Sequence, residues 1–231
     1  MIVKSLHEFL PHVPRIAYVQ DALPLVHEFL PENPIIVEAG AYTGSDTLLL
    51  AQTWPQGTVH AFEPVPEIYD SLVSRTKDIK ACITWPYALS SQVGTQDLYV
   101  AHWAARNKTA PVSSLLPPGE RTQFSSFKFD KKISVSTITL DKWALENNIT
   151  QVDMLWLDMQ GVELAVMQSS PGVLKKVRVI VTEIAAGEAY QGQPSCTEIY
   201  SWLVTQGFTP VAVHATREWF GDLVMVRTLN L

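Results

Sequence analysis

Two glycines, Gly40 and Gly44, mark a stretch of the sequence that could bind a ligand. The stretch reads VEAGAYTGSDT over residues 37–47, follows two apolar residues and precedes the apolar run LLLA. A glycine has no Cβ, so the chain can turn tightly and approach a ligand closely at these positions. The pattern predicts a strand, a turn and a helix, although an isolated pair of glycines with this spacing is more often an ordinary turn.

An acidic residue on the next predicted strand strengthens the ligand hypothesis. The strand reads TVHAFEP and places Glu63 at its carboxyl end, 19 residues after Gly44. A carboxylate in this position can accept hydrogen bonds from both hydroxyls of a ribose. The glycine turn and Glu63 together predict a site for a nucleoside.

The turn also indicates which nucleoside ligand is bound. A dinucleotide site prefers a further glycine between the two, so that the backbone approaches a pyrophosphate, and this glycine is absent. Glu38 places negative charge beside the turn, where it would repel a pyrophosphate. S-adenosylmethionine, which has an amino-acid tail and a sulfonium, suits this charge better and is the predicted cofactor. An oxidoreductase that uses NAD is the alternative, and it explains Glu63 but not Glu38.

Two further carboxylates, Asp158 and Glu183, are the candidate catalytic residues. Asp158 ends the apolar run DMLWLD, and Glu183 lies in VIVTEI. A charged group is costly to bury without a partner or a task, although Asp158 could instead cap the following helix. If their strands are neighbours, the pair could take a proton from a hydroxyl, hold a divalent cation such as Mg²⁺, or orient the reactants. His102 and His214 could act as bases, but lone histidines outside a motif are more often structural.

The elements that must position these residues alternate between strand and helix. This alternation predicts an α/β fold with a mainly parallel sheet and helices on both faces. We predict strands over residues 35–39, 58–62, 83–88, 153–158, 177–184, 208–213 and 222–227, with two more at 96–100 and 133–137. We predict helices over residues 45–53, 66–76, 141–147, 162–168 and 196–206, and two short helices, at residues 6–13 and 22–30, in an N-terminal helical segment (residues 1–34).

The remaining residues, 35–231, read as one domain with an irregular segment at residues 101–132. This segment holds six basic residues against two acidic ones, so it could meet an anionic acceptor or RNA, or be a solvated loop. Ser113 and Ser114 are candidate contacts to the acceptor. The basic residues are Arg106, Lys108, Arg121, Lys128, Lys131 and Lys132.

Composition narrows the class of protein. The chain has 231 residues, of which 47% are hydrophobic and 17% charged, so it is an ordinary globular protein. No apolar run approaches the ~18 residues that span a membrane, and the N-terminus lacks the apolar core of a secretory signal, so we expect a cytoplasmic protein. The net charge of −6 argues against nucleic-acid binding over the whole surface. Cys82 and Cys196 are too few for a disulfide framework, and the sequence predicts no oligomeric state.

Five segments, in this order, resemble the FkbM family of S-adenosylmethionine-dependent methyltransferases. They are VEAGAYTGSDT, AFEP, YALSSQVGTQDLYV, TITLDKW, and DMLWLDMQGVELAVMQSS followed by VRVIVTEI. The resemblance covers residues 35–184 and implies a Rossmann-like, seven-stranded, mostly parallel sheet. It also implies O-methylation of a hydroxyl on a small-molecule acceptor such as a sugar, a glycan or a natural product.

The resemblance implies roles for individual residues. The family's D-x-E-G-x-E signature falls on Asp158, Gln160, Gly161 and Glu163, and Gln160 replaces an acid of the pattern with a neutral amide. The implied cofactor-binding residues are Glu38, Gly40, Ala41, Gly44, Glu63 and Ala88.

Two further alternatives stay open. RNA 2′-O-methyltransferases commonly set two lysines around an Asp and a Glu, but no lysine stands beside Glu183, so we do not expect a nucleic-acid substrate. A non-catalytic Rossmann-like module that binds a partner through the basic segment gains support from Gln160.

Overall fold

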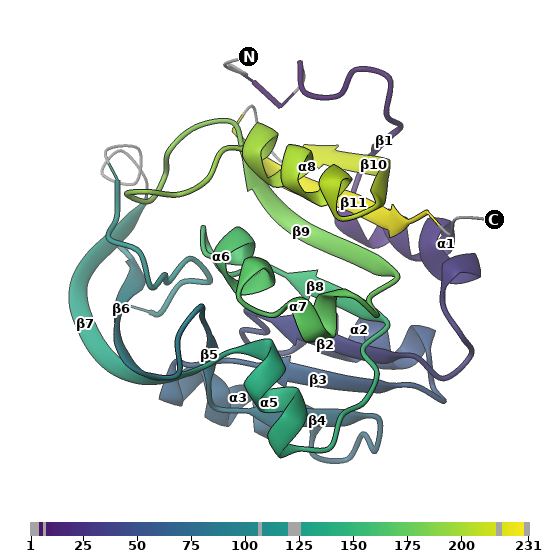
Figure 1. Ribbon diagram of the computed structural model, residues 1–231. Coiled ribbons are helices and arrows are strands. Elements are labelled where there is room, and N and C mark those ends of the chain that lie inside the picture. Colours follow the sequence, from purple (N-terminus) through teal and green to yellow (C-terminus); the bar gives the residue numbers. More distant parts are fainter. Residues whose placement is uncertain (1–4, 7, 106–107, 120–125, 216–218, 229–231) are drawn as a thin grey trace.

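The core of the fold is an eight-stranded sheet in the order β1-β10-β11-β9-β8-β2-β3-β4 (Figure 1). The computed structural model describes residues 5–6, 8–105, 108–119, 126–215 and 219–228. The strands are β1 (Arg15–Ile16), β2 (Ile35–Ala39), β3 (Thr58–Phe62), β4 (Cys82–Trp85), β8 (Met154–Leu157), β9 (Val179–Ala185), β10 (Phe208–Ala215) and β11 (Phe220–Arg227). Only β11 runs antiparallel to its two neighbours in this sheet. The predicted α/β class with a seven-stranded, mostly parallel sheet is confirmed, and the two-residue β1 adds an eighth strand at one edge.

Helices cover both faces of this sheet (Figure 1). One face carries α5 (Leu140–Glu146), α6 (Glu163–Gln168), α7 (Pro171–Leu174) and α8 (Cys196–Thr205), and the other carries α1 (Ala22–Val26), α2 (Ser45–Thr53) and α3 (Pro66–Thr76). Alternation along β2 decides which side chains meet which layer: Val37 and Ala39 pack with α5 to α8, whereas Ile36 packs with α1 and α2. Glu38 therefore belongs to the α2 face. In the described ranges, no helix has the length and apolar character that crossing a membrane requires.

A second sheet, in the order β5-β7-β6, projects from the main one (Figure 1). Strands β6 (Gly94–Trp103) and β7 (Phe127–Ile138) form a long antiparallel hairpin, and β5 (Ala88–Leu89) pairs in parallel with β7. The predicted strand at residues 83–88 is therefore wrong as one element, because Pro86 lacks an N–H and separates β4 from β5. The segment predicted to be irregular begins inside β6 and ends inside β7. Most side chains in the first half of β7 are exposed, so its hydrophobic alternation is weak and the sequence does not reveal the strand there.

The N-terminal segment is less helical than the sequence predicts. The described residues of the range 6–13, namely 6 and 8–13, form turns and bends, with bonds such as that from the Phe9 amide to the Leu6 carbonyl, because Pro11 and Pro14 provide no donors for a helix. The second predicted helix, at residues 22–30, is confirmed over most of its length, because α1 continues directly into the 3₁₀ helix η2 (His27–Phe29), and a further 3₁₀ helix, η1 (Val19–Asp21), precedes α1. Leu6 and Phe9 are nevertheless buried in the main core, and β1 pairs with β10.

Candidate active site

A pocket lies where the carboxyl ends of β2, β3 and β8 meet, closed on one side by residues 109–119, here called the strap. About 590 Å³ of space lies between its walls, with the open solvent at its mouth included. The Tyr42 hydroxyl donates to the Thr109 carbonyl (2.9 Å), and the Ser114 hydroxyl donates to the Gln160 carbonyl (2.7 Å). These bonds join the strap to the ends of β2 and β8. Ligands of open α/β sheets bind at this edge, near the point where strand order reverses.

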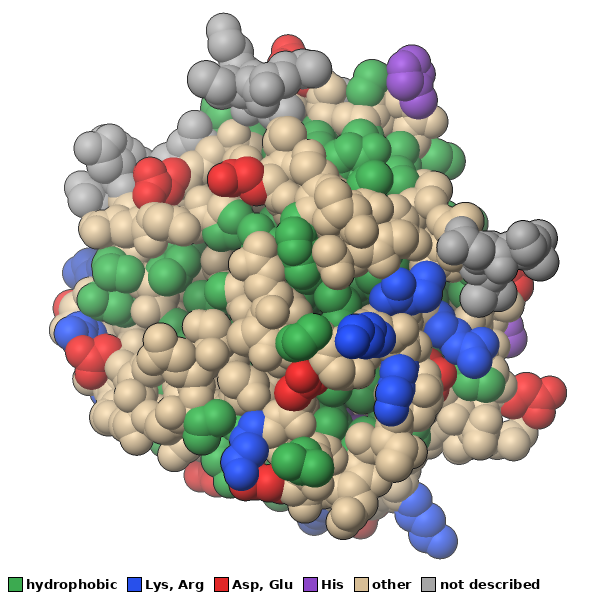
Figure 2. Space-filling view, viewed as in Figure 1, with side chains coloured by type: hydrophobic (Ala, Val, Ile, Leu, Met, Phe, Trp, Pro, Cys, Tyr) green, Lys and Arg blue, Asp and Glu red, His purple; other side chains and the backbone are tan. Residues whose placement is uncertain are grey.

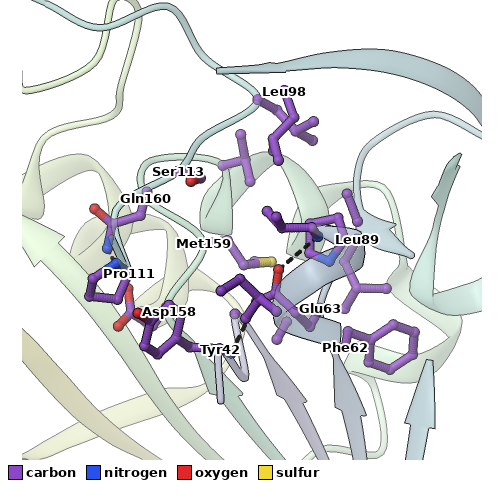
Figure 3. A pocket seen from close by; sticks show the side chains of 18 of the residues that line it. Tyr42, Phe62, Glu63, Leu89, Leu98, Pro111, Ser113, Asp158, Met159 and Gln160 are labelled. Carbon is purple, nitrogen blue, oxygen red and sulfur yellow. Dashed lines mark hydrogen bonds between the residues drawn. The ribbon is translucent and has the colours of Figure 1, made fainter. Parts of the chain in front are cut away.

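The predicted residues divide into two groups around this pocket. Four of them line it, and Figure 3 labels two of these, Glu63 and Asp158. The four are Gly40, Glu63, Ala88 and Asp158. The other four candidates are not among the described residues that line the pocket: Glu38, Ala41, Gly44 and Glu183. Ser113 also lines the pocket.

The glycine turn keeps the end of β2 in contact with the end of β8. Gly40 has a left-handed backbone (φ +84°), and a Cβ added to it would lie 1.8 Å from the Asp158 carbonyl oxygen. Only a residue without a side chain allows this approach. Gly44 (φ +83°) has a different task, because it precedes α2 and an added Cβ would lie 2.7 Å from a methyl carbon of Leu72 on α3.

Glu63 is a buried carboxylate held by the backbone. Its Oε2 accepts from the Tyr42 amide (3.0 Å), and its Oε1 accepts from the Val65 amide (2.8 Å). Burial raises the pKa of Glu63 to about 7, and the two hydrogen bonds oppose this shift. Each oxygen keeps further lone pairs with which it can accept from a ligand at the pocket wall.

Glu38 and Ala41 lie behind the wall. Glu38 is buried on the α2 face, its Oε2 has no hydrogen-bond partner among the described residues, and burial raises its pKa to about 8. Neighbouring Asp46 and Asp158 add to this shift. Ala41 packs against α3 through Leu72. A direct contact between Glu38 and a ligand amino group therefore stays a prediction.

The acidic signature after β8 assigns different tasks to its two acids. Glu163 is buried, and it accepts from the Met159 amide (2.7 Å) and the Gly161 amide (3.0 Å), so it holds the loop. Asp158 faces the pocket and accepts from the Gln160 side-chain amide (2.5 Å; Figure 3). Solvent reaches Asp158, yet the protein around it raises the pKa of its carboxyl, chiefly by desolvation and secondarily through Asp222.

Glu183 adjoins Asp158 and extends the acidic region across the sheet. Its strand pairs with β8, and its direct partner on β11 is Asp222. Desolvation, followed by the charges of Asp158, Glu163 and Asp222, raises the pKa of Glu183 well above its usual range, and its Oε2 has no partner among the described residues. Asp222 lies 2.8 Å from Nδ1 of His214, which raises the pKa of that histidine. His214 is therefore an ion-pair partner of this region.

The acidic region does not form a metal cage in the part of the chain that the structure describes. No group of three or more His, Cys, Asp or Glu side chains there could hold a metal ion. Asp158 and Glu183 thus offer two carboxylates without a third ligand, which gives the predicted Mg²⁺ site no geometric support.

The four basic residues of the predicted irregular segment that the structure describes, Lys108, Lys128, Lys131 and Lys132, are not on the pocket wall. The described residues that line the pocket include no lysine or arginine. Lys132 instead pairs with Asp97 (2.5 Å) and lies over the ring of Tyr99. Two of the basic residues, Arg106 and Arg121, lie outside the described residues.

Two tyrosines that the sequence analysis does not single out complete the site. Tyr42 lies within the quoted glycine turn, has a left-handed backbone (φ +48°) and contacts both Glu63 and the strap. Tyr190 follows β9 and donates to Oε1 of Gln160 (2.8 Å). The position of Tyr42 in the motif is a usable signal, whereas no local pattern marks Tyr190.

The sequence pattern of the methyltransferase FkbM domain matches residues 38–210, which include the glycine turn, Glu63 and the acidic signature. The chain belongs to the FkbM methyltransferase family. Membership confirms the predicted class of domain, a methyltransferase.

Three curated proteins are similar in sequence to this FkbM chain. 2-O-methyltransferase NoeI of Sinorhizobium fredii is 28% identical over 70% of the chain and 67% of its own length. Hexuronic acid methyltransferase AglP of Haloferax volcanii is 24% identical over 73% of the chain and 63% of its own length. Methyltransferase sdnD of Sordaria araneosa is 29% identical over 60% of the chain and 61% of its own length. The chain thus spans about two thirds of each relative's length, or slightly less.

Solved structures confirm the fold of this FkbM domain. A fibrillarin in complex with Nop5p has a TM-score of 0.51 at 12% identity, covering 86% of this chain and 75% of that one. The N-terminal domain of EvdMO1, solved with S-adenosylhomocysteine bound, has a TM-score of 0.50 at 13% identity, covering 91% and 81%. At these identities the likeness concerns the fold alone.

Proposed function

We propose that this FkbM protein transfers the methyl group of S-adenosylmethionine to a hydroxyl oxygen of a sugar-type acceptor. One observation carries the proposal: Glu63 from the end of β3 and Asp158 from the end of β8 line the same pocket, beside the Gly40 turn. The names of two relatives support the acceptor class, since one is a 2-O-methyltransferase and the other acts on a hexuronic acid.

The residues of the pocket fit this methyl donor. Glu63 can accept from ribose hydroxyls, and the apolar side chains of Phe62, Ile68 and Leu89 offer a surface for a base. Asp158 contributes negative charge, and the described wall has no lysine or arginine to oppose a positively charged ligand. When bound, S-adenosylmethionine supplies an electrophilic methyl group on a sulfonium.

The protein's main contribution to the reaction is to position the acceptor. Methyl transfer needs the hydroxyl oxygen in line with the donor's methyl carbon, and correct placement alone accelerates such reactions greatly. Asp158 is the carboxylate on the pocket wall that can take the hydroxyl proton, and its raised pKa makes it a stronger base than an ordinary aspartate. Glu183, next to Asp158, can share that proton.

A divalent cation is a secondary proposal at the same place. Asp158 and Glu183 could supply two oxygen ligands, with the acceptor hydroxyl and water as the others. Full methyl transfer after exhaustive EDTA treatment excludes the metal, whereas loss of rate that added Mg²⁺ restores supports it.

Isothermal titration tests the donor, and an acceptor panel tests the reaction. We expect S-adenosylmethionine and S-adenosylhomocysteine to bind, and NADH to give no fluorescence signal of binding. The panel pairs neutral sugars with their uronic acids, and product is detected as S-adenosylhomocysteine together with a methylated acceptor. If neither S-adenosylmethionine nor S-adenosylhomocysteine binds, the proposal is wrong. A preference for uronic acids would support an anionic acceptor.

A further inference from the structure

We propose that Gln160 and Tyr190 are a positioning pair, which fixes the direction of the Asp158 carboxylate through a hydrogen-bonded chain that persists when Asp158 ionises. The inference deepens the proposed function and rests on it, because it takes Asp158 to be part of the methyl-transfer site. Gln160 is the residue at which this chain departs from its family's acidic signature.

The chain of contacts has a defined direction. The Tyr190 hydroxyl shares its one proton between Oε1 of Gln160 (2.8 Å) and the Val112 carbonyl (2.7 Å), and Nε2 of Gln160 donates to Oδ1 of Asp158 (2.5 Å). Reversing the amide would place its oxygen against a carboxylate oxygen, which is repulsive. The Asp158 carboxylate thus favours the amide orientation that presents hydrogens to it, the Tyr190 hydroxyl supports this orientation at the amide oxygen, and the same amide also interacts with Glu183.

The backbone around Gln160 is held in an uncommon conformation. Gln160 has a left-handed backbone (φ +58°), which is costly for a residue with a side chain and persists only where the surroundings impose it. The Ser114 hydroxyl binds its carbonyl (2.7 Å), and Glu163 binds the next amide, that of Gly161 (3.0 Å). Gln160 and Tyr190 are 5% and 2% exposed, so little water competes for the hydrogen bond between them.

A neutral amide performs a task here that an acid could perform only while protonated. A carboxylate at position 160 would place an oxygen near Oδ1 of Asp158, in a region that already contains Glu163, Glu183 and Asp222. Such an acid would need a proton and would lose it as the pH rises, whereas the amide hydrogens of Gln160 are always present. Tyr190 is an equally constant donor, because burial and the charge of Glu183 raise its pKa.

Carboxyl NMR titration of the 231-residue chain tests the pair without requiring an acceptor. Protein labelled with ¹³C at Asp carboxyls is titrated as the parent and as Gln160→Glu, Tyr190→Phe and Tyr200→Phe, and Asp158→Asn assigns the resonance. A hydrogen bond donated to the ionised carboxylate lowers the pKa of Asp158. Loss of this hydrogen bond should therefore raise the titration midpoint of Asp158. We expect a rise of about one pH unit or more in Gln160→Glu, from the added like charge, and a smaller rise in Tyr190→Phe.

Tyr200→Phe is the matched control, because Tyr200 lies on α8 and packs edge-on against Phe9. Its Asp158 midpoint should equal that of the parent. If Gln160→Glu fails to fold, Gln160→Met removes the donor without adding charge and should still raise the midpoint. Midpoints unchanged in every folded variant at positions 160 and 190 would overturn the positioning pair.

A second readout separates this inference from the proposed function. S-adenosylhomocysteine affinity in Tyr190→Phe should stay within about two-fold of the parent, while the rate with any acceptor from the panel falls about ten-fold. If the parent binds neither S-adenosylmethionine nor S-adenosylhomocysteine, but the titration midpoints of Asp158 shift as expected in the variants, the proposed function is wrong and the positioning pair is supported. A fall in affinity without a fall in rate would contradict the pair.

Discussion

Replacement of Glu63 tests the donor site through a single side chain. Glu63 already accepts from the amides of Tyr42 and Val65, and its remaining lone pairs are available to a ribose. A hydrogen bond to a charged group contributes about 1.5 kcal/mol, so loss of two ribose bonds costs about 3 kcal/mol in Glu63→Ala. That loss weakens donor binding by a factor of roughly 150. Glu63→Gln keeps one acceptor oxygen, and we expect a weakening of roughly ten-fold.

The pH dependence of donor binding provides an independent check on the same residue. Burial raises the pKa of Glu63 to about 7, so the free protein protonates this carboxyl as the pH falls through 7. Because the ribose hydroxyls bind the ionised form more strongly, affinity should fall below pH 7 and level off above it. Glu63→Gln has no proton to exchange and should lose this dependence.

The assay is isothermal titration with S-adenosylhomocysteine across this range of pH. Glu146→Gln is the matched control, because Glu146 pairs with Lys142 (2.8 Å) on the surface of α5 and should leave binding unchanged. Thermal unfolding of each variant reports whether the turn held by Glu63 remains folded. Glu63→Ala that folds and binds within about two-fold of the parent would refute the ribose assignment.

Three further substitutions give distinct outcomes. Gly40→Ala should cost more than about 2 kcal/mol of stability, because the new Cβ would meet the Asp158 carbonyl. Gly192→Ala is the control, because Gly192 has a similar φ of +78° but open space around it, so this variant carries the backbone strain without the clash. Equal losses of stability in the two variants, measured by thermal unfolding, would contradict the role of the clash. Glu38→Gln should stabilise the protein above pH 8, by on the order of 3 kcal/mol, and have little effect near pH 5. Burial raises the pKa of Glu38 to about 8 in the folded protein, so the parent loses stability as the pH rises from 5 to 8, and the glutamine variant avoids this loss. Melts at both ends of that range check this, and a shift that does not depend on pH would count against it. Asp158→Asn should retain affinity for S-adenosylhomocysteine, which has no sulfonium charge, and lose about 100-fold in turnover, and unchanged turnover would favour a non-catalytic module.

Local patterns were sufficient to predict the elements that carry the candidate donor-binding residues. The helices predicted at residues 45–53 and 66–76 match α2 and α3, and the strands at 35–39 and 58–62 match β2 and β3. Residues that favour helix starts mark the two helices, because Gly44 precedes α2 and Pro66 begins α3. The prediction of a helix at residues 6–13 was wrong, because it gave more weight to the helical spacing of apolar residues than to Pro11 and Pro14.

Long-range pairing decided what the local patterns left open. Ala88 is the last residue of the strand predicted at residues 83–88, yet it pairs with Thr137 in the second sheet. That change of sheet brings β5 to the pocket wall, and no property of residues 83–88 alone specifies it. The strands β6 and β7 likewise extend further than predicted, because hydrogen bonds between them compensate for weak alternation.

Sequence patterns alone were enough to predict the family, the alternating order of strands and helices, and candidate donor-binding residues at the strand ends, because periodicity, glycine and proline act locally. Which side of the sheet each acid faces depends on the tertiary structure. Glu38 lies behind the pocket, Asp158 lies on its wall, and Glu183 faces Asp222 across a strand pair. It also brought Tyr190, 30 residues away in the sequence, against Gln160, since contacts at this separation depend on sheet order and loop packing.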